Sequence, residues 1–209
     1  PAGLGCRFQV LSPGEGTLGA ISLPMPGAHN VRNALAAVSV GLGMGLEFGA
    51  IAEALGKFSG VHRRFEQLGL WQGAHVVDDY AHHPTEVVAT LEAARAAFPG
   101  ARIWAVFQPH LFSRTRDLAT EFGRSLLAAD GALVTDIYAS REAPLPGVSG
   151  TLVVDAARES GHRNVAFCAD WRDAPELLRG RVGRNDVVIT LGAGDIYRLA
   201  EELSGEEAA

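Results

Sequence analysis

The chain has 209 residues, of which 47% are hydrophobic and 20% are charged, a composition that allows a sizeable hydrophobic core. Its formal net charge of -6 argues against a nonspecific nucleic-acid surface. No run approaches the roughly 18 to 20 apolar residues that a membrane span needs. We therefore expect neither nucleic acid nor membrane among the partners.

The cysteines and the first residues indicate a cytoplasmic protein. Cys6 and Cys168 form neither a metal-binding spacing nor a disulfide framework, which fits a reducing compartment. The first residues lack the charged region and apolar stretch of a signal peptide.

Residues 1–61 read as a hairpin followed by two helices. Strands are expected at 7–10 and 18–23, on either side of a turn at 12–16, and apolar residues recur at helical spacing over 30–42 and 48–58. These elements make a poor core by themselves, so we expect this segment to pack on another part of the protein.

From residue 64 onward, short apolar strands alternate with amphipathic helices. This alternation predicts an α/β fold, a Rossmann-like, doubly wound and mostly parallel sheet. A helix is expected from Thr85 to Phe98, with Pro84 in its first turn. The expected strands are 66–70, 75–77, 102–107, 132–137, 164–168 and 187–191.

Polar side chains gather where two of these strands end. The segment 78–86 reads DDYAHHPTE, and the segment 108–117, after the following strand, reads QPHLFSRTRD. Open α/β sheets collect ligands at the carboxyl ends of their strands. We expect these two strands to be neighbours in the sheet and to present their polar ends side by side. A Pro- and Gly-containing loop at 142–150 is long enough to cover a site.

Several segments, in order along the chain, resemble motifs of the Mur ligase family of peptidoglycan synthesis. They are GAHNVRNA at 27–34, VHRRFE at 61–66, DDYAHHPTE at 78–86, FQPHLFSRTRD at 107–117, EAPLPG at 142–147 and GAGDI at 192–196. The resemblance covers essentially the whole chain. It implies that residues 62–209 form a Mur ligase C-terminal domain and that residues 1–61 are the tail of the central ATP-binding domain, with the N-terminal and most of the central domain missing.

The resemblance also implies an activity: ATP-dependent joining of L-alanine to UDP-N-acetylmuramate through an acyl phosphate, with ATP and magnesium (Mg2+) as cofactors. The His-His-Pro and Gln-Pro-His strings favour the alanine-adding type over other ligases of the family. No G-x-x-x-x-G-K-[ST] string occurs, so the phosphate-binding loop and most magnesium ligands are expected in the missing part. We accordingly expect the 209-residue chain alone to be inactive.

For the nucleotide, the resemblance assigns His29, Asn30 and Asn33 to the adenine pocket. An Asn amide both donates and accepts, which suits the edge of adenine. Arg64 matches the junction arginine that reaches the nucleotide phosphates and takes part in catalysis, and Asp79 matches an aspartate that accepts from the ribose hydroxyls. Read without the resemblance, Asn30 and Asn33 would be ordinary helix-start and surface residues.

For the amino acid, the resemblance points to Tyr80, His82, His110 and Arg114, the last three being also catalytic. Arg114 suits a substrate carboxylate, and an imidazole suits a proton relay from the attacking amine. Leu111 departs from the family pattern, where a basic residue often follows the histidine, so the carboxylate would depend more on Arg114.

Other interpretations remain open at this stage. Another amino-acid ligase of the same family shares the nucleotide positions, and a catalytically silent nucleotide- or amino-acid-binding module fits the absent phosphate loop. A Rossmann-like domain for a sugar or a flavin is disfavoured because GAGDI is a weak phosphate motif. We expect no metal site, since His82 and His83 lack further ligands at suitable spacing.

Overall fold

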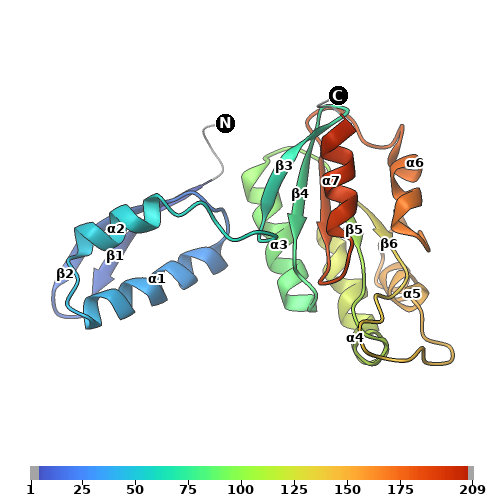
Figure 1. Ribbon diagram of the computed structural model, residues 1–209, viewed down its shortest axis with the longest axis horizontal. Helices are drawn as coiled ribbons and strands as arrows, with labels where there is room; N and C mark the ends of the chain where they lie inside the picture. The colour runs from blue at the N-terminus through green and yellow to red at the C-terminus, as the bar shows by residue number, and fades with distance from the viewer. Residues whose placement is uncertain (1–4, 207–209) are drawn as a thin grey trace. The chain divides into compact units, whose positions relative to one another are not determined.

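The computed structural model describes residues 5–206, and the chain divides into two compact units, Pro1–Val61 and His62–Ala209 (Figure 1). This division falls at the boundary drawn from the sequence. The assignment of the first unit to a central ATP-binding domain remains a prediction.

The first unit contains the expected hairpin and two helices. Strands β1 (Cys6–Ser12) and β2 (Gly16–Leu23) pair antiparallel, and α1 (Ala28–Gly43) and α2 (Phe48–Gly56) follow. Its buried core is small and consists of Val10, Ile21, Val38 and Ile51.

Large apolar side chains remain exposed on the first unit. Val40 is 63% exposed, Leu46 is 53% exposed and Met44 is 75% exposed. These side chains give the first unit exposed apolar surface. That this unit packs on another part of the protein stays a prediction.

The second unit is built on a six-stranded sheet of order β3-β4-β8-β5-β6-β7. β3 runs antiparallel to β4, and the other neighbouring strands are parallel. The expected α/β class and mostly parallel sheet are confirmed. The strands are β3 (Glu66–Trp71), β4 (Ala74–Asp79), β5 (Ile103–Phe107), β6 (Gly131–Val134), β7 (Val165–Phe167) and β8 (Val187–Leu191).

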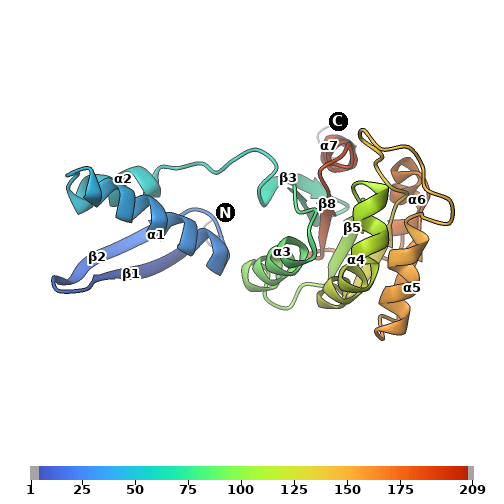
Figure 2. The same ribbon diagram turned by 90° about the horizontal axis from the view of Figure 1, so that it is seen from below.

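Helices cover both faces of this sheet, as Figure 2 shows. On one face lie α3 (Pro84–Ala97), α4 (Phe112–Ser125) and α5 (Thr151–Glu159). On the other lie α6 (Ala174–Leu178) and α7 (Tyr197–Glu206). Single turns of 3-10 helix, Leu126–Ala128 and Trp171–Asp173, follow α4 and precede α6.

The core lies against the two central strands. Every residue of β5 and of β8 is buried, because both faces of these strands are covered. On the α4 face, the rings of Phe107 and Phe122 lie 5.0 Å apart. Within the described residues, no helix is long and apolar enough to cross a membrane.

The expected pairing of the two strands that carry the polar segments is wrong. β8, the last strand of the chain, lies between β4 and β5. Hydrophobic periodicity identifies a buried strand but carries no information about its neighbours, and in doubly wound sheets the chain returns to the centre. As a consequence, the loop that follows β8, residues 192–195, lies between the two polar segments.

Candidate functional site

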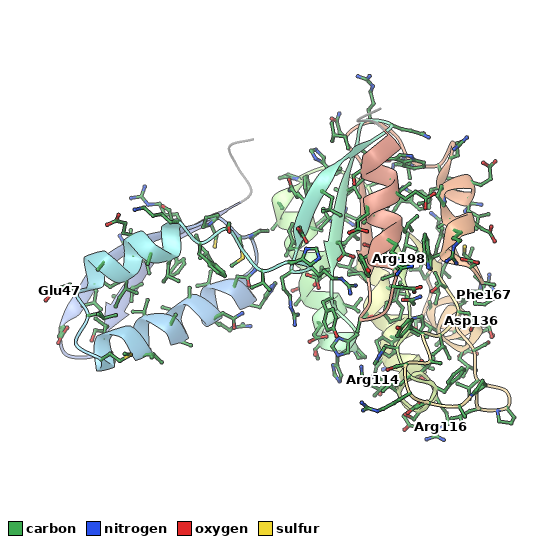
Figure 3. All side chains as sticks on the ribbon, in the orientation of Figure 1. Glu47, Arg114, Arg116, Asp136, Phe167 and Arg198 are labelled. Atoms are coloured by element: carbon green, nitrogen blue, oxygen red, sulfur yellow. The ribbon has the colours of Figure 1, made fainter. Side chains whose placement is uncertain are left out.

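The polar segments meet at the carboxyl ends of β4, β8 and β5. In Figure 1 this is the end of the second unit at which α7 begins, and Figure 3 labels Arg114 there. Three loops converge at this edge because parallel strands all end on the same side of the sheet. The loop after β8 is tied to both neighbours: Gly192 N donates to Asp79 O (3.1 Å) and Gln108 N donates to Leu191 O (2.9 Å).

Arg63 joins β4 to the loop after β8. Its guanidinium donates to Asp78 Oδ2 (3.0 Å), to Gly192 O (2.6 Å) and to Gly194 O (3.1 Å). Asp78 is 1% exposed and also accepts from Thr190 Oγ1 at 2.5 Å. Burial raises the pKa of Asp78 despite the hydrogen bonds from Thr190 and Arg63. The pair is therefore a buried ion pair that orders the floor of the site.

Arg64, the arginine matched to nucleotide phosphates, has a different environment from its neighbour. The guanidinium of Arg63 lies over the rings of Tyr80 (5.1 Å) and Tyr197 (4.6 Å), and that of Arg64 lies 5.5 Å from Tyr80. Among the described residues, the Arg64 side chain has no hydrogen bond or ion pair, and the residue is exposed. Its donors are thus available to an anionic ligand, whereas those of Arg63 are engaged within the fold.

Asp79 is buried, and its carboxylate fixes the segment before β3 and the segment after β4. It is 5% exposed, and its carboxylate accepts from Phe65 N and from Ala81 N, both at 2.8 Å. Burial raises the pKa of Asp79, opposed by these hydrogen bonds and by the charge of Arg64. A carboxylate oxygen can accept more than one hydrogen bond, so the ribose contact remains a prediction.

Gln108 and Gly194 shape the space between β8 and β5. The Gln108 amide donates to Asp195 Oδ1 (2.8 Å) and accepts from Ile196 N (3.2 Å). A Cβ at Gly194 would lie 2.3 Å from Gln108 Oε1 and 2.5 Å from Cγ of Tyr138. Glycine is required there because the neighbouring side chains approach its backbone so closely.

The His82 ring is oriented by backbone contacts that define its tautomer. Nδ1 lies 2.9 Å from Tyr80 O, and a carbonyl oxygen can only accept, so Nδ1 carries the proton in this contact. In the neutral ring, Nε2 is then a proton acceptor. The backbone around it is held by Glu86, whose Oε2 accepts from His82 N (2.9 Å) and His83 N (3.1 Å) at the start of α3.

Four rings form a row across the site, which we call the aromatic row. The Tyr80 and His82 centroids are 5.2 Å apart and the His82 and His110 centroids are 6.0 Å apart, both edge to face. His110 then stacks on Tyr138 at 5.9 Å with an interplanar angle of 15°. Such contacts restrict ring orientation and stabilise the arrangement modestly.

His110 is held in a state that disfavours its charge. Its Nδ1 is buried and has no hydrogen-bond partner among the described residues. Burial lowers the pKa of His110, and the nearby charge of Arg114 lowers it further. The imidazole is therefore neutral at neutral pH and can accept a proton.

Arg114 lies in the first turn of α4, next to this row. Its Nη1 donates to His82 O at 3.3 Å, a long contact that leaves most of its donors open. Glu142 holds the start of α4 by accepting from Ser113 N (2.9 Å) and Ser113 Oγ (2.5 Å). Leu111, just before the helix, has a φ of 71°, a left-handed value that residues with a Cβ rarely adopt.

The predicted adenine residues lie in the first unit, on α1. Asn30 is partly buried and donates to Pro26 O at 2.8 Å, while Asn33 is exposed and His29 partly exposed. Their role in adenine binding remains a prediction. No cluster of three or more His, Cys, Asp and Glu side chains suited to a metal occurs within residues 5–206.

The structure thus brings Tyr80, His82, His110 and Arg114 together, as the sequence analysis proposed. It adds residues that the sequence reasoning did not assign: Arg63, Gln108, Tyr138 and Gly194. Gln108 and Gly194 lie within the motif strings FQPH and GAGD, and these strings are the signal by which the sequence could identify them. Tyr138 lies in a loop where no quoted motif includes it.

The fold and the site define an α/β domain whose polar residues gather at the carboxyl ends of parallel strands, the place where open sheets of this type collect ligands. Residues 63–194 match the family described as "Mur ligase, glutamate ligase domain", and the chain belongs to this family.

Named relatives agree with this assignment. The chain is 50% identical over 199 residues to a UDP-N-acetylmuramate--L-alanine ligase of Salinibacter ruber, which covers 95% of this chain and 42% of that protein. It is 51% identical over 206 residues to a Rubrobacter xylanophilus protein of the same name, covering 94% of this chain and 46% of that protein. The chain therefore spans less than half the length of these relatives.

This chain is also similar to a solved structure of a protein with a corresponding name. The crystal structure of a UDP-N-acetylmuramate-alanine ligase from Thermotoga maritima is similar with a TM-score of 0.81 and 29% sequence identity. The match covers 98% of this chain and 43% of that one.

Proposed function

We propose that this chain is the C-terminal part of an ATP-dependent ligase that joins L-alanine to UDP-N-acetylmuramate in peptidoglycan synthesis. The observation that carries the proposal is the convergence of Tyr80, His82, His110 and Arg114 at the strand ends. The relatives that bear this enzyme's name support it at 50% and 51% identity.

The amino-acid substrate brings a carboxylate and an amine that must lose its proton before it attacks. Arg114 presents a planar fork of donors that matches a carboxylate. Within the described part of the chain, only one of these donors is engaged, with His82 O at 3.3 Å. Nε2 of His82 accepts a proton when the ring is neutral, because its Nδ1 faces Tyr80 O. His110, also neutral, is a second acceptor within the same row.

ATP, when bound, supplies the phosphoryl group that activates the UDP-N-acetylmuramate carboxylate. Arg64 fits a phosphate ligand because its guanidinium is exposed and without a polar partner in the described part of the chain. The role of Asp79 toward a ribose hydroxyl rests on the family resemblance alone. The same holds for the adenine-binding role of His29, Asn30 and Asn33. Magnesium is expected to bind mostly through the remainder of the ligase, because this chain contains no G-x-x-x-x-G-K-[ST] string.

The partners proposed for the chain follow from this assignment. They are UDP-N-acetylmuramate, L-alanine and ATP as substrates, and the N-terminal and central domains of the same protein. A cytoplasmic location follows from the same substrates.

The test uses the full-length protein that contains this chain, with ATP, magnesium and UDP-N-acetylmuramate present. Phosphate release is measured on addition of L-alanine, glycine, L-serine or D-glutamate, one at a time. We expect L-alanine to give the highest kcat/KM and the 209-residue chain alone to release no phosphate. A clear preference for D-glutamate would instead favour another ligase of the family, and phosphate release by the chain alone would contradict the proposal.

A further inference from the structure

Tyr138 is linked to His110 through the backbone as well as through its ring. It lies in the loop between β6 and α5, and its amide N donates to Pro109 O at 2.9 Å. Its carbonyl accepts from Leu111 N at 3.1 Å. The residues on both sides of His110 are therefore bonded to Tyr138, and the two residues form an isolated parallel bridge. This pairing places the two rings on the same side, where they stack at 5.9 Å and 15°.

The Tyr138 ring has little freedom to leave this position. The backbone of Gly194 lies close to this side chain. A Cβ added at Gly194 would lie 2.5 Å from Cγ of Tyr138 and 2.8 Å from Cβ of Tyr138. The ring thus packs against the Gly194 backbone as well as against His110, yet the residue remains 38% exposed. The Tyr138 side chain is thus fixed by its neighbours and still accessible from the strand ends, where a ligand would bind.

The orientation of His110 decides which nitrogen is available. Of its two ring nitrogens, Nδ1 is the one that is enclosed and unpartnered within the described residues. Nε2 is therefore the nitrogen through which the ring reaches a ligand. A flip of the imidazole about its Cβ–Cγ bond would bring Cε1 to the place of Nε2 and Cδ2 to the place of Nδ1. A ring stacked on one face of the imidazole opposes the tilting that such a flip requires.

We propose that Tyr138 is a positioning residue: its stacked ring holds the His110 imidazole with Nε2, and not a ring carbon, facing the amino-acid substrate. This inference rests on the proposed function, in which His110 serves the L-alanine side of the site. Tyr138 acts through the plane of its ring, so the phenol oxygen is not required.

The charged groups around His110 come from each element that packs near it. Arg114 on α4 and His82 after β4 disfavour its charged form, and so does Arg141 on the loop that carries Tyr138. Glu142 on that loop favours the charged form, and burial, the largest influence, lowers the pKa of His110. Removal of the Tyr138 ring would admit water to the imidazole, so the pKa of His110 should rise toward its ordinary value.

The first measurement is histidine titration by NMR in the 209-residue chain. His110 is assigned by the signal that His110→Gln removes, and Tyr138→Ala is compared with Tyr138→Phe. The matched control is Leu127→Ala, which removes another exposed side chain, 45% exposed and located after α4. We expect the pKa of His110 to rise in Tyr138→Ala and to stay unchanged in Tyr138→Phe and in the control.

The second measurement is the pH profile of kcat/KM for L-alanine in the full-length protein. Because a proton acceptor works only when unprotonated, a higher pKa of His110 moves the acidic limb of the profile to higher pH. In Tyr138→Ala we expect this shift and a loss of about 10-fold or more in kcat/KM at neutral pH, with recovery in Tyr138→Phe. If Tyr138→Ala does not fold, as judged by tryptophan emission, Tyr138→Leu takes its place.

The outcomes separate this inference from the proposed function. An unchanged pKa of His110 in Tyr138→Ala, or a Tyr138→Phe variant as impaired as Tyr138→Ala, overturns the positioning role. The NMR result could be as expected while neither the parent protein nor any variant releases phosphate with L-alanine. In that case the proposed function fails, and the link of Tyr138 to L-alanine is overturned with it.

Discussion

The two adjacent junction arginines should differ sharply in their effect on stability. Arg63 forms the counter-charge of Asp78, which is 1% exposed, and donates to the carbonyls of Gly192 and Gly194. Arg64 has no hydrogen bond or ion pair in the part of the chain that the structure describes. We therefore compare Arg63→Ala with Arg64→Ala in the 209-residue chain.

The magnitude follows from what each substitution leaves behind. Arg63→Ala leaves a buried carboxylate without its counter-charge, which costs about 3 to 5 kcal/mol. The lost bonds to the two carbonyls are included in this figure, because the effects of one network do not add. Arg64→Ala removes an exposed side chain, so we expect a change within about 0.5 kcal/mol.

The difference should depend on pH. Burial raises the pKa of Asp78, and the loss of Arg63 raises it further above the unfolded value. The penalty in Arg63→Ala is therefore present above the folded pKa of Asp78. It is lost as the pH falls through that value, because the protonated carboxyl no longer needs a counter-charge.

The assay is urea unfolding followed by tryptophan emission. All three tryptophans, Trp71, Trp104 and Trp171, lie in the second unit, so the signal reports on that unit alone. A loss of 3 kcal/mol moves the midpoint by roughly 1 to 3 M urea. The double variant Arg63→Ala with Asp78→Asn should recover part of the loss. Arg63→Ala within about 1 kcal/mol of the parent would refute the reasoning, as would equal losses in the two arginine variants.

Three further predictions concern the nucleotide, acid stability and the core. In the full-length protein, Arg64→Ala should raise the KM for ATP about 10-fold or more, since a hydrogen bond to a charged group is worth roughly 1.5 to 3 kcal/mol. The urea midpoint should stay at the parent value. An unchanged KM for ATP would contradict the role assigned to Arg64. The pKa of Asp186 is lowered because hydrogen bonds from Arg102 and Gly183 N outweigh the effect of burial, so this carboxylate stabilises the fold above its unfolded pKa. That contribution is lost as the pH falls through the folded pKa, and Asp186→Asn should flatten the acid side of the stability curve measured by urea unfolding. Hydrogen exchange should be slowest in Val187–Leu191, whose residues are all buried, and faster in α2; the reverse order would contradict the division of the core.

The sequence was sufficient to predict the class of fold and most elements. Alternating short apolar runs and helical stripes identified the strands of the second unit because central strands must be apolar on both faces. Expected strands at 132–137 and 164–168 are shorter in the structure, at Gly131–Val134 and Val165–Phe167. Ile137 and Cys168 are apolar and set the expected ends, but the last paired residues of these two strands are Val134 and Phe167.

The position of β8 could not be predicted in this way. Its neighbours in the sheet are decided by long-range packing of the last crossover connection, and the local hydrophobic pattern of the strand carries no information about them. The GAGDI segment is a weak phosphate motif by its glycine pattern, and only the position of β8 between β4 and β5 puts this loop in the centre of the candidate site.

The individual roles within the site also exceeded what the sequence could settle. Arg63 and Arg64 are the same residue type side by side, and only the fold distinguishes the guanidinium that is hydrogen-bonded from the one that is open. The motif strings did predict that Tyr80, His82, His110 and Arg114 belong together. Tyr138 joins them through a loop contact that no spacing rule encodes.

The central claim is that Arg114 binds the carboxylate of the amino-acid substrate at the strand ends. It is tested most directly by the KM for L-alanine of full-length Arg114→Lys at saturating ATP and UDP-N-acetylmuramate. Arg116→Lys is the matched control, because Arg116 is exposed on the same helix and pairs with Asp117. Figure 3 labels both arginines.

The account predicts an increase of about 10- to 100-fold in the KM for Arg114→Lys, because an ammonium cannot reproduce the planar fork of donors. Arg116→Lys should keep the parent value. An unchanged KM in Arg114→Lys, or an equal increase in both variants, would contradict the claim.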